Sequence, residues 1–295
     1  MSDEPQFDVT LTLDEFRVLL ECAPETVLPA SLAVGVLDAS VASQSRRDTA
    51  RIALGTRNLV DAESAPHPLL AMALAMPLVA DSSIQVQSWN PATTAWTLVA
   101  LAGRSMALFT IELPRSRTEP VTDALTATVG EITITLGPVA LVSGRLGALL
   151  ADSPAAAPGF SPVRVEIGLV ESRSILAAIR RGDHALVDRL AAQFGAAAAV
   201  PVLRSLAGTM EAGFRLHSFV RPGTPVRALE WFQSSSGDWL SMHLAASADA
   251  DGTVTPQALV DTGRVLIQRQ RHRDITAELL NLISTVTIGA SHVRG

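Results

Sequence analysis

Hydrophobic and polar positions alternate with a period of two in two long stretches of the chain. The first stretch spans residues 84–110 and contains three alternating runs, with turn signals at Asn90-Pro91 and Gly103-Arg104 between them. The second stretch spans residues 214–243 and has the same arrangement. Alternation of this kind is typical of strands with one buried face, so each stretch is predicted to form a three-stranded antiparallel meander.

The chain begins with a pattern that predicts a strand followed by a helix. Residues 7–11 alternate between apolar and polar, and Thr12 and Glu15 then have the spacing of a capping box, which starts a helix. A second, strongly apolar helix is predicted to follow Pro66 and Pro68, to run through Met76 and to end at Pro77. Residues 40–64 between these helices are too polar to assign.

Each meander is followed by a further strand or helix signal. Ile132 and Ile134 predict a fourth strand, and Pro138 then fits the first turn of a helix, where a missing amide proton costs nothing. After the second meander, Thr255-Pro256 predicts the start of a helix that contains residues 259–267. The shared order of elements predicts an internal repeat, and the alternative is a chance likeness among short hairpins.

The part between the two meanders divides the chain. Residues 151–162 are rich in Ala, Pro and Ser and are interpreted as a linker, and residues 171–206 carry three short helical patterns separated by Gly182 and Gly195. We therefore predict an α+β fold of two halves related by a pseudo-two-fold axis, each an antiparallel meander followed by a helix. The halves are residues 1–152 and residues 163–295, the second with a helical bundle, within one compact domain.

Composition excludes several functions. The chain has 295 residues and a formal net charge of -6, and all 23 basic residues are arginine. An acidic chain repels phosphate backbones, so no nucleic-acid partner is expected. The absence of lysine excludes a Walker lysine, a Schiff-base lysine and a kinase strand lysine, because each of these reactions needs an amine.

Residues that could carry chemistry lack the necessary spacing. The six histidines have no metal-binding pattern, no nucleophile elbow is present, and Cys22 sits on an apolar helix face, where a small buried side chain is expected. We assign no catalytic residue, no metal and no cofactor. The first residues lack a secretory signal, and the apolar run over residues 68–80 is too short for a bilayer, so a cytoplasmic protein without stable membrane insertion is expected.

The aromatic residues of the second meander suggest a binding surface. Trp231 and Phe232 are adjacent on one predicted strand and therefore point to opposite sheet faces, with Trp239 on the next strand. Either helices cover both faces and all three residues belong to the core, or one face is an open apolar platform for a partner.

Several segments together resemble the EspG family of cytoplasmic chaperones of actinobacterial type VII secretion. The resemblance rests on the order of FDVTLTLDEFRVLLECA, SWNPATTAWTLVALAGRSMALFTIE, ITITLGP and RALEWFQSSSGDWLSMHLAASADADGTVTPQALVDTGRVLI. It implies a non-catalytic protein that binds the apolar helical tip of PE–PPE-type substrates in a groove between the sheet and the helices of the second half. By their chemistry, the partner-binding candidates there are Trp231, Phe232, Trp239, Phe194 and Leu203.

Two other functions stay open. One is a small-molecule-binding protein or enzyme with a pocket between the two halves, which would need convergent titratable groups. The other is a homodimeric scaffold in which the apolar tail, residues 274–290, packs against its own copy.

Overall fold

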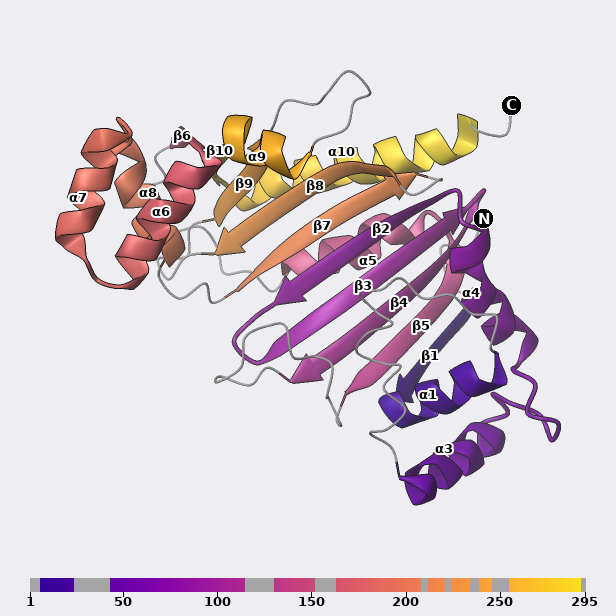
Figure 1. Ribbon diagram of the computed structural model, residues 1–295. Helices are drawn as coiled ribbons and strands as arrows, with labels where there is room; N and C mark the ends of the chain where they lie inside the picture. Colours follow the sequence, from indigo (N-terminus) through magenta and orange to yellow (C-terminus); the bar gives the residue numbers. More distant parts are fainter. Residues whose placement is uncertain are drawn as a thin grey trace. The chain divides into compact units, whose positions relative to one another are not determined.

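The computed structural model describes residues 6–23, 43–114, 130–151, 163–207, 212–220, 224–233, 239–245 and 255–292 (Figure 1). These residues form α-helices and antiparallel strands, so the chain is α+β, as the sequence predicts. Two compact units can be distinguished. The first contains Met1–Ala151, Leu216–Arg227 and Glu278–Gly295, and the second contains Asp152–Arg215 and Ala228–Ala277.

The first series of elements runs from β1 to α5. Its strands are β1 (Phe7–Thr12), β2 (Ser82–Trp89), β3 (Thr93–Ala102), β4 (Ser105–Pro114) and β5 (Glu131–Pro138). Its helices are α1 (Leu13–Cys22), α3 (Gln44–Thr56), α4 (Pro68–Val79) and α5 (Leu141–Ala151). The strands are hydrogen-bonded in the order β1-β5-β4-β3-β2, and the neighbouring pairs are antiparallel. The first predicted meander is therefore confirmed as β2, β3 and β4.

The capping box predicted at the start of α1 is present. Thr12 has extended backbone angles, and its Oγ1 accepts a hydrogen bond from the Glu15 backbone N–H at 3.2 Å. The Glu15 carboxylate accepts one in return from the Thr12 N–H at 2.7 Å. Two amides that the first helical turn would leave unpaired are thus satisfied, which fixes where the strand becomes a helix.

The core of the first unit lies between one face of its sheet and the helices α1, α3 and α4. Phe109 on β4 lies opposite Leu98 on β3 and Ile134 on β5, and all three side chains are almost fully buried. Phe16 of α1 and Leu54 of α3 belong to the same cluster and are also fully buried. Alternate strand residues meet the apolar helix faces there, which is the arrangement that period-two patterning predicts.

The second series runs from β6 to α10. Its strands are β6 (Arg164–Gly168), β7 (Ala212–Val220), β8 (Thr224–Gln233), β9 (Trp239–Ala245) and β10 (Arg264–Gln270). Its helices are α6 (Leu169–Arg180), α7 (His184–Gln193), the 3-10 helix η3 (Ala197–Ala199), α8 (Val200–Ala207), α9 (Pro256–Thr262) and α10 (His272–His292). The second predicted meander is confirmed as β7, β8 and β9.

The two series have the same topology. The strand order is β1-β5-β4-β3-β2 in the first and β6-β10-β9-β8-β7 in the second, and each series reads strand, helices, four strands and helix along the chain, apart from the extra helix α9. The internal repeat is therefore present in topology. The limits of the two predicted halves and their pseudo-two-fold axis stay predictions.

The helix predicted through residue 267 is wrong in its second part. Thr255 does cap a helix, since its Oγ1 accepts the Ala258 N–H at 3.1 Å, but α9 ends at Thr262. Val265 and Ile267 lie in β10, which pairs with both β9 and β6. A short apolar run has no periodicity of its own, so the neighbouring strands decided between helix and strand.

Two proline-based boundaries are also wrong. Pro138 is the last residue of β5, opposite Ser105, and α5 begins only at Leu141. Pro77 lies inside the last turn of α4, which continues to Val79. Proline fixes its own φ angle, but the residue at which a nearby helix begins or ends also depends on tertiary packing. The sequence also did not predict α3 or β6.

Some predictions fall outside the described residues. The predicted linker begins at Ala151, the last residue of α5, and its remainder lies outside them. Within the described part of the chain, no helix is both long and apolar enough to cross a membrane.

Candidate functional site

The three aromatic candidates of the second meander are buried. Trp231 and Phe232 lie on β8, and Trp239 begins β9 opposite Gln233. Their exposed fractions are 0% for Trp231, 7% for Phe232 and 3% for Trp239. Trp231 and Phe232 occupy opposite sheet faces, so both faces are covered at this point. This is the arrangement of the alternative in which all three belong to the core.

Trp231 and Trp239 form an aromatic cluster with Phe214 of β7. The rings of Phe214 and Trp231 stack with centroids 4.4 Å apart, and Trp239 approaches Phe214 edge-on at 6.0 Å. The Trp231 Nε1–H donates to Oε1 of Gln270 at 3.0 Å, whereas the buried Trp239 Nε1–H has no partner among the described residues. Aromatic pairs of this geometry add to the stability that burial supplies.

The other two candidates lie in the helical part of the second unit. Leu203 of α8 is fully buried, and Phe194, the C-terminal cap residue of α7, is partly exposed. Helix α8 packs against α6 and η3, and α7 packs against the same two elements. Phe194 thus has the most accessible side chain of the five candidates. A partner contact at any of the five stays a prediction.

The structure shows a cavity that the sequence did not predict. It lies in the first unit, has a volume of about 730 Å³, and opens beside the N-terminal ends of α1 and α3. It is lined by Thr12, Leu13, Asp14, Glu15, Ser45, Arg46, Thr49, Ala50, Ala53, Thr93, Glu112, Gly130 and Glu131. Residues 40–64 carried no clear pattern, so no sequence signal placed α3 at this site.

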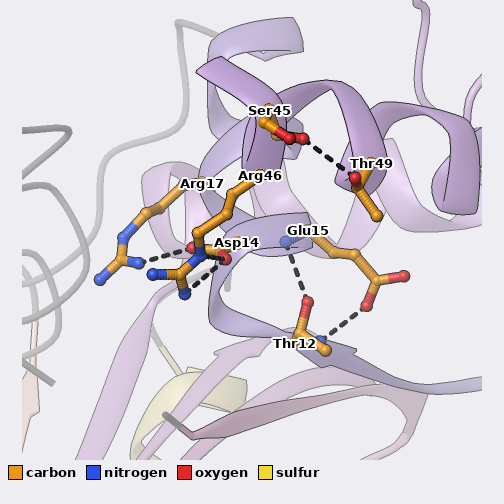
Figure 2. A network of polar contacts seen from close by, with 7 residues as sticks. All are labelled: Thr12, Asp14, Glu15, Arg17, Ser45, Arg46 and Thr49. Atoms are coloured by element: carbon orange, nitrogen blue, oxygen red, sulfur yellow. Dashed lines mark hydrogen bonds and ion pairs between the residues drawn. The ribbon is translucent and has the colours of Figure 1, made fainter. Parts of the chain in front are cut away.

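Ion pairs hold α3 against α1 beside the cavity (Figure 2). Asp14 accepts from Arg17 on its own helix at 3.0 Å and from Arg46 of α3 at 2.7 Å. Arg57, which follows α3, pairs with Glu15 at 3.1 Å and donates to the Thr10 carbonyl oxygen at 2.8 Å. The cations of α3 therefore neutralise the carboxylates at the start of α1, where those carboxylates also favour the helix dipole.

The opposite wall of the cavity carries two carboxylates. Glu112 on β4 and Glu131 on β5 are directly opposite in register, and both side chains are exposed. Like charges at this spacing repel each other weakly in water. No group of three or more His, Cys, Asp or Glu in the described part of the chain could hold a metal ion. The cavity thus combines a mainly apolar lining with a few hydroxyl and charged groups.

The surroundings of Cys22 make its thiol less reactive near neutral pH. It is partly buried at the end of α1 and packs against the core of the first unit. Burial raises the pKa of the Cys22 thiol, the nearby charge of Arg51 opposes this shift, and Glu21 adds to it. A raised pKa keeps the thiol protonated near neutral pH, so less of the reactive thiolate is present.

Comparisons with known proteins connect the fold to a solved structure. No protein-family model matches the chain, and no curated protein matches it. Two solved dehydratase domains, an N-terminal one from the difficidin assembly line and one from the CurJ module of curacin polyketide synthase, are 8% and 12% identical. They cover 72% and 70% of this chain and 88% and 81% of their own, with TM-scores of 0.14 and 0.15, and carry no argument.

A third solved structure matches nearly the whole chain. It is the Mycobacterium tuberculosis type VII secretion system chaperone EspG5, solved in complex with a PE25–PPE41 dimer. The likeness covers 95% of both chains at a TM-score of 0.58, with 10% sequence identity. This chain therefore has an EspG-like fold.

Proposed function

We propose that this protein is a non-catalytic chaperone that binds the apolar helical tip of PE–PPE-type type VII secretion substrates in the cytosol. One observation carries the proposal: the fold is that of EspG5 over 95% of both chains, and that chaperone was solved with a PE–PPE dimer bound. At 10% identity the likeness extends to the fold alone, so the partner of this chain needs its own test.

The proposed binding groove belongs to the second unit and involves the helices α6 to α8 and the part of the second meander in that unit, residues 228–245. An exposed apolar helix tip needs an apolar groove with a polar rim, which shields it from water until the cargo is handed on. Because Trp231, Trp239 and Leu203 are buried, their substitution by alanine would disturb the core as well as any groove. Phe194 is the better probe, since its side chain is partly exposed.

The test is an affinity purification of the tagged protein from the cytosol of its own host, with mass spectrometry of the co-purifying chains. The wild type is expected to retain a stoichiometric pair of PE–PPE-like helical proteins. Phe194→Ala is expected to lose most of this pair while it keeps the wild-type circular dichroism spectrum. Leu186→Ala, a partly buried position on the same helix α7, is the matched control for lost helix packing.

The outcome that contradicts the proposal is recovery of the protein without any helical pair, in a host shown to express such pairs. Retention of the pair by Phe194→Ala would contradict the position of the groove and leave the chaperone function supported.

The cavity of the first unit favours a second candidate function, binding of a small molecule with both apolar and polar groups. Its volume of about 730 Å³ is within the usual size of ligand pockets, roughly 300–1,000 Å³, and its lining carries several hydroxyl groups. Native mass spectrometry of the purified protein tests this candidate. A bound mass that disappears in Thr49→Leu would support it, and an unliganded mass from host and recombinant sources would contradict it.

The homodimeric alternative is weakened by the burial of the tail. Ile275, Leu279, Leu282 and Val286 of α10 are between 0% and 3% exposed within the single chain. These four apolar side chains are therefore already packed within the chain, whereas Leu280 on the same helix is 43% exposed. A homodimer by another surface stays a prediction.

A further inference from the structure

The exposed side of α6 combines positive charge with apolar surface. Its exposed residues are Val170, Arg173, Ala177 and Arg180, which follow each other at intervals of three or four and so form one helix face. Val170 is 45% exposed. The face carries two arginines and no carboxylate. We call it the α6 face.

The arginines of this region have no acidic partner in the described part of the chain. Residues 163–207 contain six arginines and four carboxylates, a formal charge of +2 in a chain of -6. None of the six arginine side chains makes a hydrogen bond or ion pair among the described residues. In the first unit, by contrast, arginines on α1, α3 and α5 pair with nearby carboxylates.

Two of the four carboxylates of this region are engaged in other contacts. Glu166 pairs with Arg264 at 3.0 Å. Asp183 caps α7 by accepting the Leu186 N–H at 2.9 Å. Glu171 of α6 and Asp188 of α7 form no ion pair with an arginine among the described residues. The positive charge of the α6 face is therefore available to a partner.

We propose that the α6 face binds an acidic face of a helix in the partner protein. This inference rests on the proposed function and adds the chemistry by which the helical cargo is recognised. Arg173 and Arg180 are seven residues apart, which places them about 10.5 Å apart along the axis, so carboxylates at the same spacing on a partner helix would match both. Ala177 lies between them, and its small side chain allows two helices to approach closely.

The size and charge of the α6 face favour a protein helix over a nucleic acid. Two arginines over two helical turns contact too few phosphates for stable binding, and the chain as a whole is negatively charged. Val170 and Ala177 also give the face apolar surface, which suits an amphipathic helix.

The test is a charge reversal of the α6 face in the full chain. Arg173→Glu/Arg180→Glu is compared with Arg104→Glu, an exposed arginine in the β3–β4 turn that has no side-chain partner among the described residues. The wild type, the double variant and the Arg104→Glu control are each used to capture the helical pair from host cytosol. The double variant is expected to weaken capture about tenfold at low salt, and the control is expected to match the wild type. The wild type should lose affinity as salt rises to about 0.15 M and beyond, and the double variant should lose this dependence.

Each outcome separates this inference from the proposed function. If the wild type captures the pair and the double variant captures it equally well, the inference is wrong and the chaperone function stands. If the wild type captures no pair, the proposed function fails, and the α6 face is then tested with a synthetic amphipathic helical peptide. This peptide carries glutamate at seven-residue spacing, and its glutamine version is the control.

Salt-sensitive binding of the glutamate peptide to the wild type, lost in the double variant, would support the inference by itself. Equal affinity for the two peptides would overturn it. Retention of the wild type, but not the double variant, on vesicles of phosphatidylcholine and phosphatidylserine, without peptide binding, would also overturn it in favour of a lipid surface.

Discussion

The indole Nε1–H of Trp231 on β8 donates a hydrogen bond to the side-chain Oε1 of Gln270, the last residue of β10, at 3.0 Å. Strand β9 pairs with both β8 and β10, so this bond spans three strands. It gives the buried ring the polar partner that a tryptophan needs in a core. The side chain of Trp231 therefore connects the second meander to β10, a strand that the sequence of residues 264–270 did not predict.

Loss of this bond is expected to destabilise the second unit without emptying its core. Trp231→Phe keeps an aromatic ring but removes the donor and leaves some space, at a cost of about 2–3 kcal/mol. Trp231→Ala should cost about 3–5 kcal/mol. Urea unfolding followed by circular dichroism measures both. A Trp231→Ala protein with wild-type stability would show that the ring is not packed as described and would restore it as a surface candidate.

Asp14 is expected to hold α3 in place. Asp14→Asn removes the charge that pairs with both Arg17 and Arg46, and Arg17 is buried, so we expect a loss of about 1–2 kcal/mol. Hydrogen exchange should become faster in α3 before it changes in the sheet. Glu63→Gln, an exposed carboxylate in the turn before α4, is the matched control. An unchanged rate of hydrogen exchange in α3 would mean that the apolar contacts of Ala50 and Leu54 hold the helix in place without the ion pairs of Asp14.

The capping box at Thr12 gives a conservative pair of variants. Thr12→Ala loses the side-chain acceptor for the Glu15 N–H and is expected to cost about 1 kcal/mol, while Thr12→Ser keeps it and should stay close to the wild type. Thermal unfolding of the three proteins side by side measures the difference. Equal melting temperatures for the two variants would refute a role for the cap.

Two glycine-to-alanine substitutions are expected to have opposite effects. A Cβ at Gly130 would lie 3.0 Å from the Glu112 carbonyl oxygen and against the Leu113 side chain, so Gly130→Ala should destabilise by about 1–3 kcal/mol. Gly55 lies in α3 with open space around its Cα, so Gly55→Ala should stabilise by about 0.5–1 kcal/mol. Chemical denaturation of both variants measures the change in the free energy of unfolding. A change of the same sign in both variants would contradict the prediction.

The Cys22 thiol is expected to react slowly. Because burial raises its pKa, the folded protein holds less thiolate than the unfolded chain at the same pH, and alkylation by iodoacetamide should be slower than in urea. The difference should shrink as the pH rises through the raised pKa. Arg51→Gln removes a charge that lowers this pKa and should slow the reaction further, whereas Arg104→Gln should not change it.

The same shift has a consequence for stability. A thiol with a raised folded-state pKa contributes stability below its ordinary pKa, and this contribution is lost as the pH rises through the folded value, since the unfolded chain releases its proton first. Replacement of Cys22 by alanine should therefore make the free energy of unfolding fall less steeply as the pH rises into the alkaline range. If the stability of the wild type and of the Cys22→Ala protein falls equally as the pH rises, the Cys22 thiol is exposed to water in the folded protein and its pKa is not raised.

Local patterns predicted most elements because their causes are local. The alternation at residues 84–110 predicts β2 to β4, and Thr12 with Glu15 predicts the start of α1 to the residue. Helix α3 was missed because its side chains are mostly charged and polar, with only Ala50 and Leu54 buried. Its position depends on carboxylates of α1, which no pattern within residues 44–56 contains.

The candidate site was predicted less well than the fold. Adjacent Trp231 and Phe232 necessarily occupy opposite faces, and that much follows from strand geometry. Whether either face is open depends on what packs on it, and the structure buries both residues. The exposed residues of α6 were equally hidden in the sequence, since an arginine at period 3.6 looks the same whether its carboxylate partner is near or absent.

The amino-acid sequence by itself determined the α+β class, the two meanders, the repeated order of elements and the exclusion of chemistry that needs lysine. Each of these depends on residue type or on neighbours a few positions apart. Tertiary structure alone decided that residues 264–270 form a strand, because Ile267 pairs with Val165 about a hundred positions away. It also decided that Trp231 is buried and that the α6 face is exposed, because burial depends on contacts between distant segments and not on any single segment.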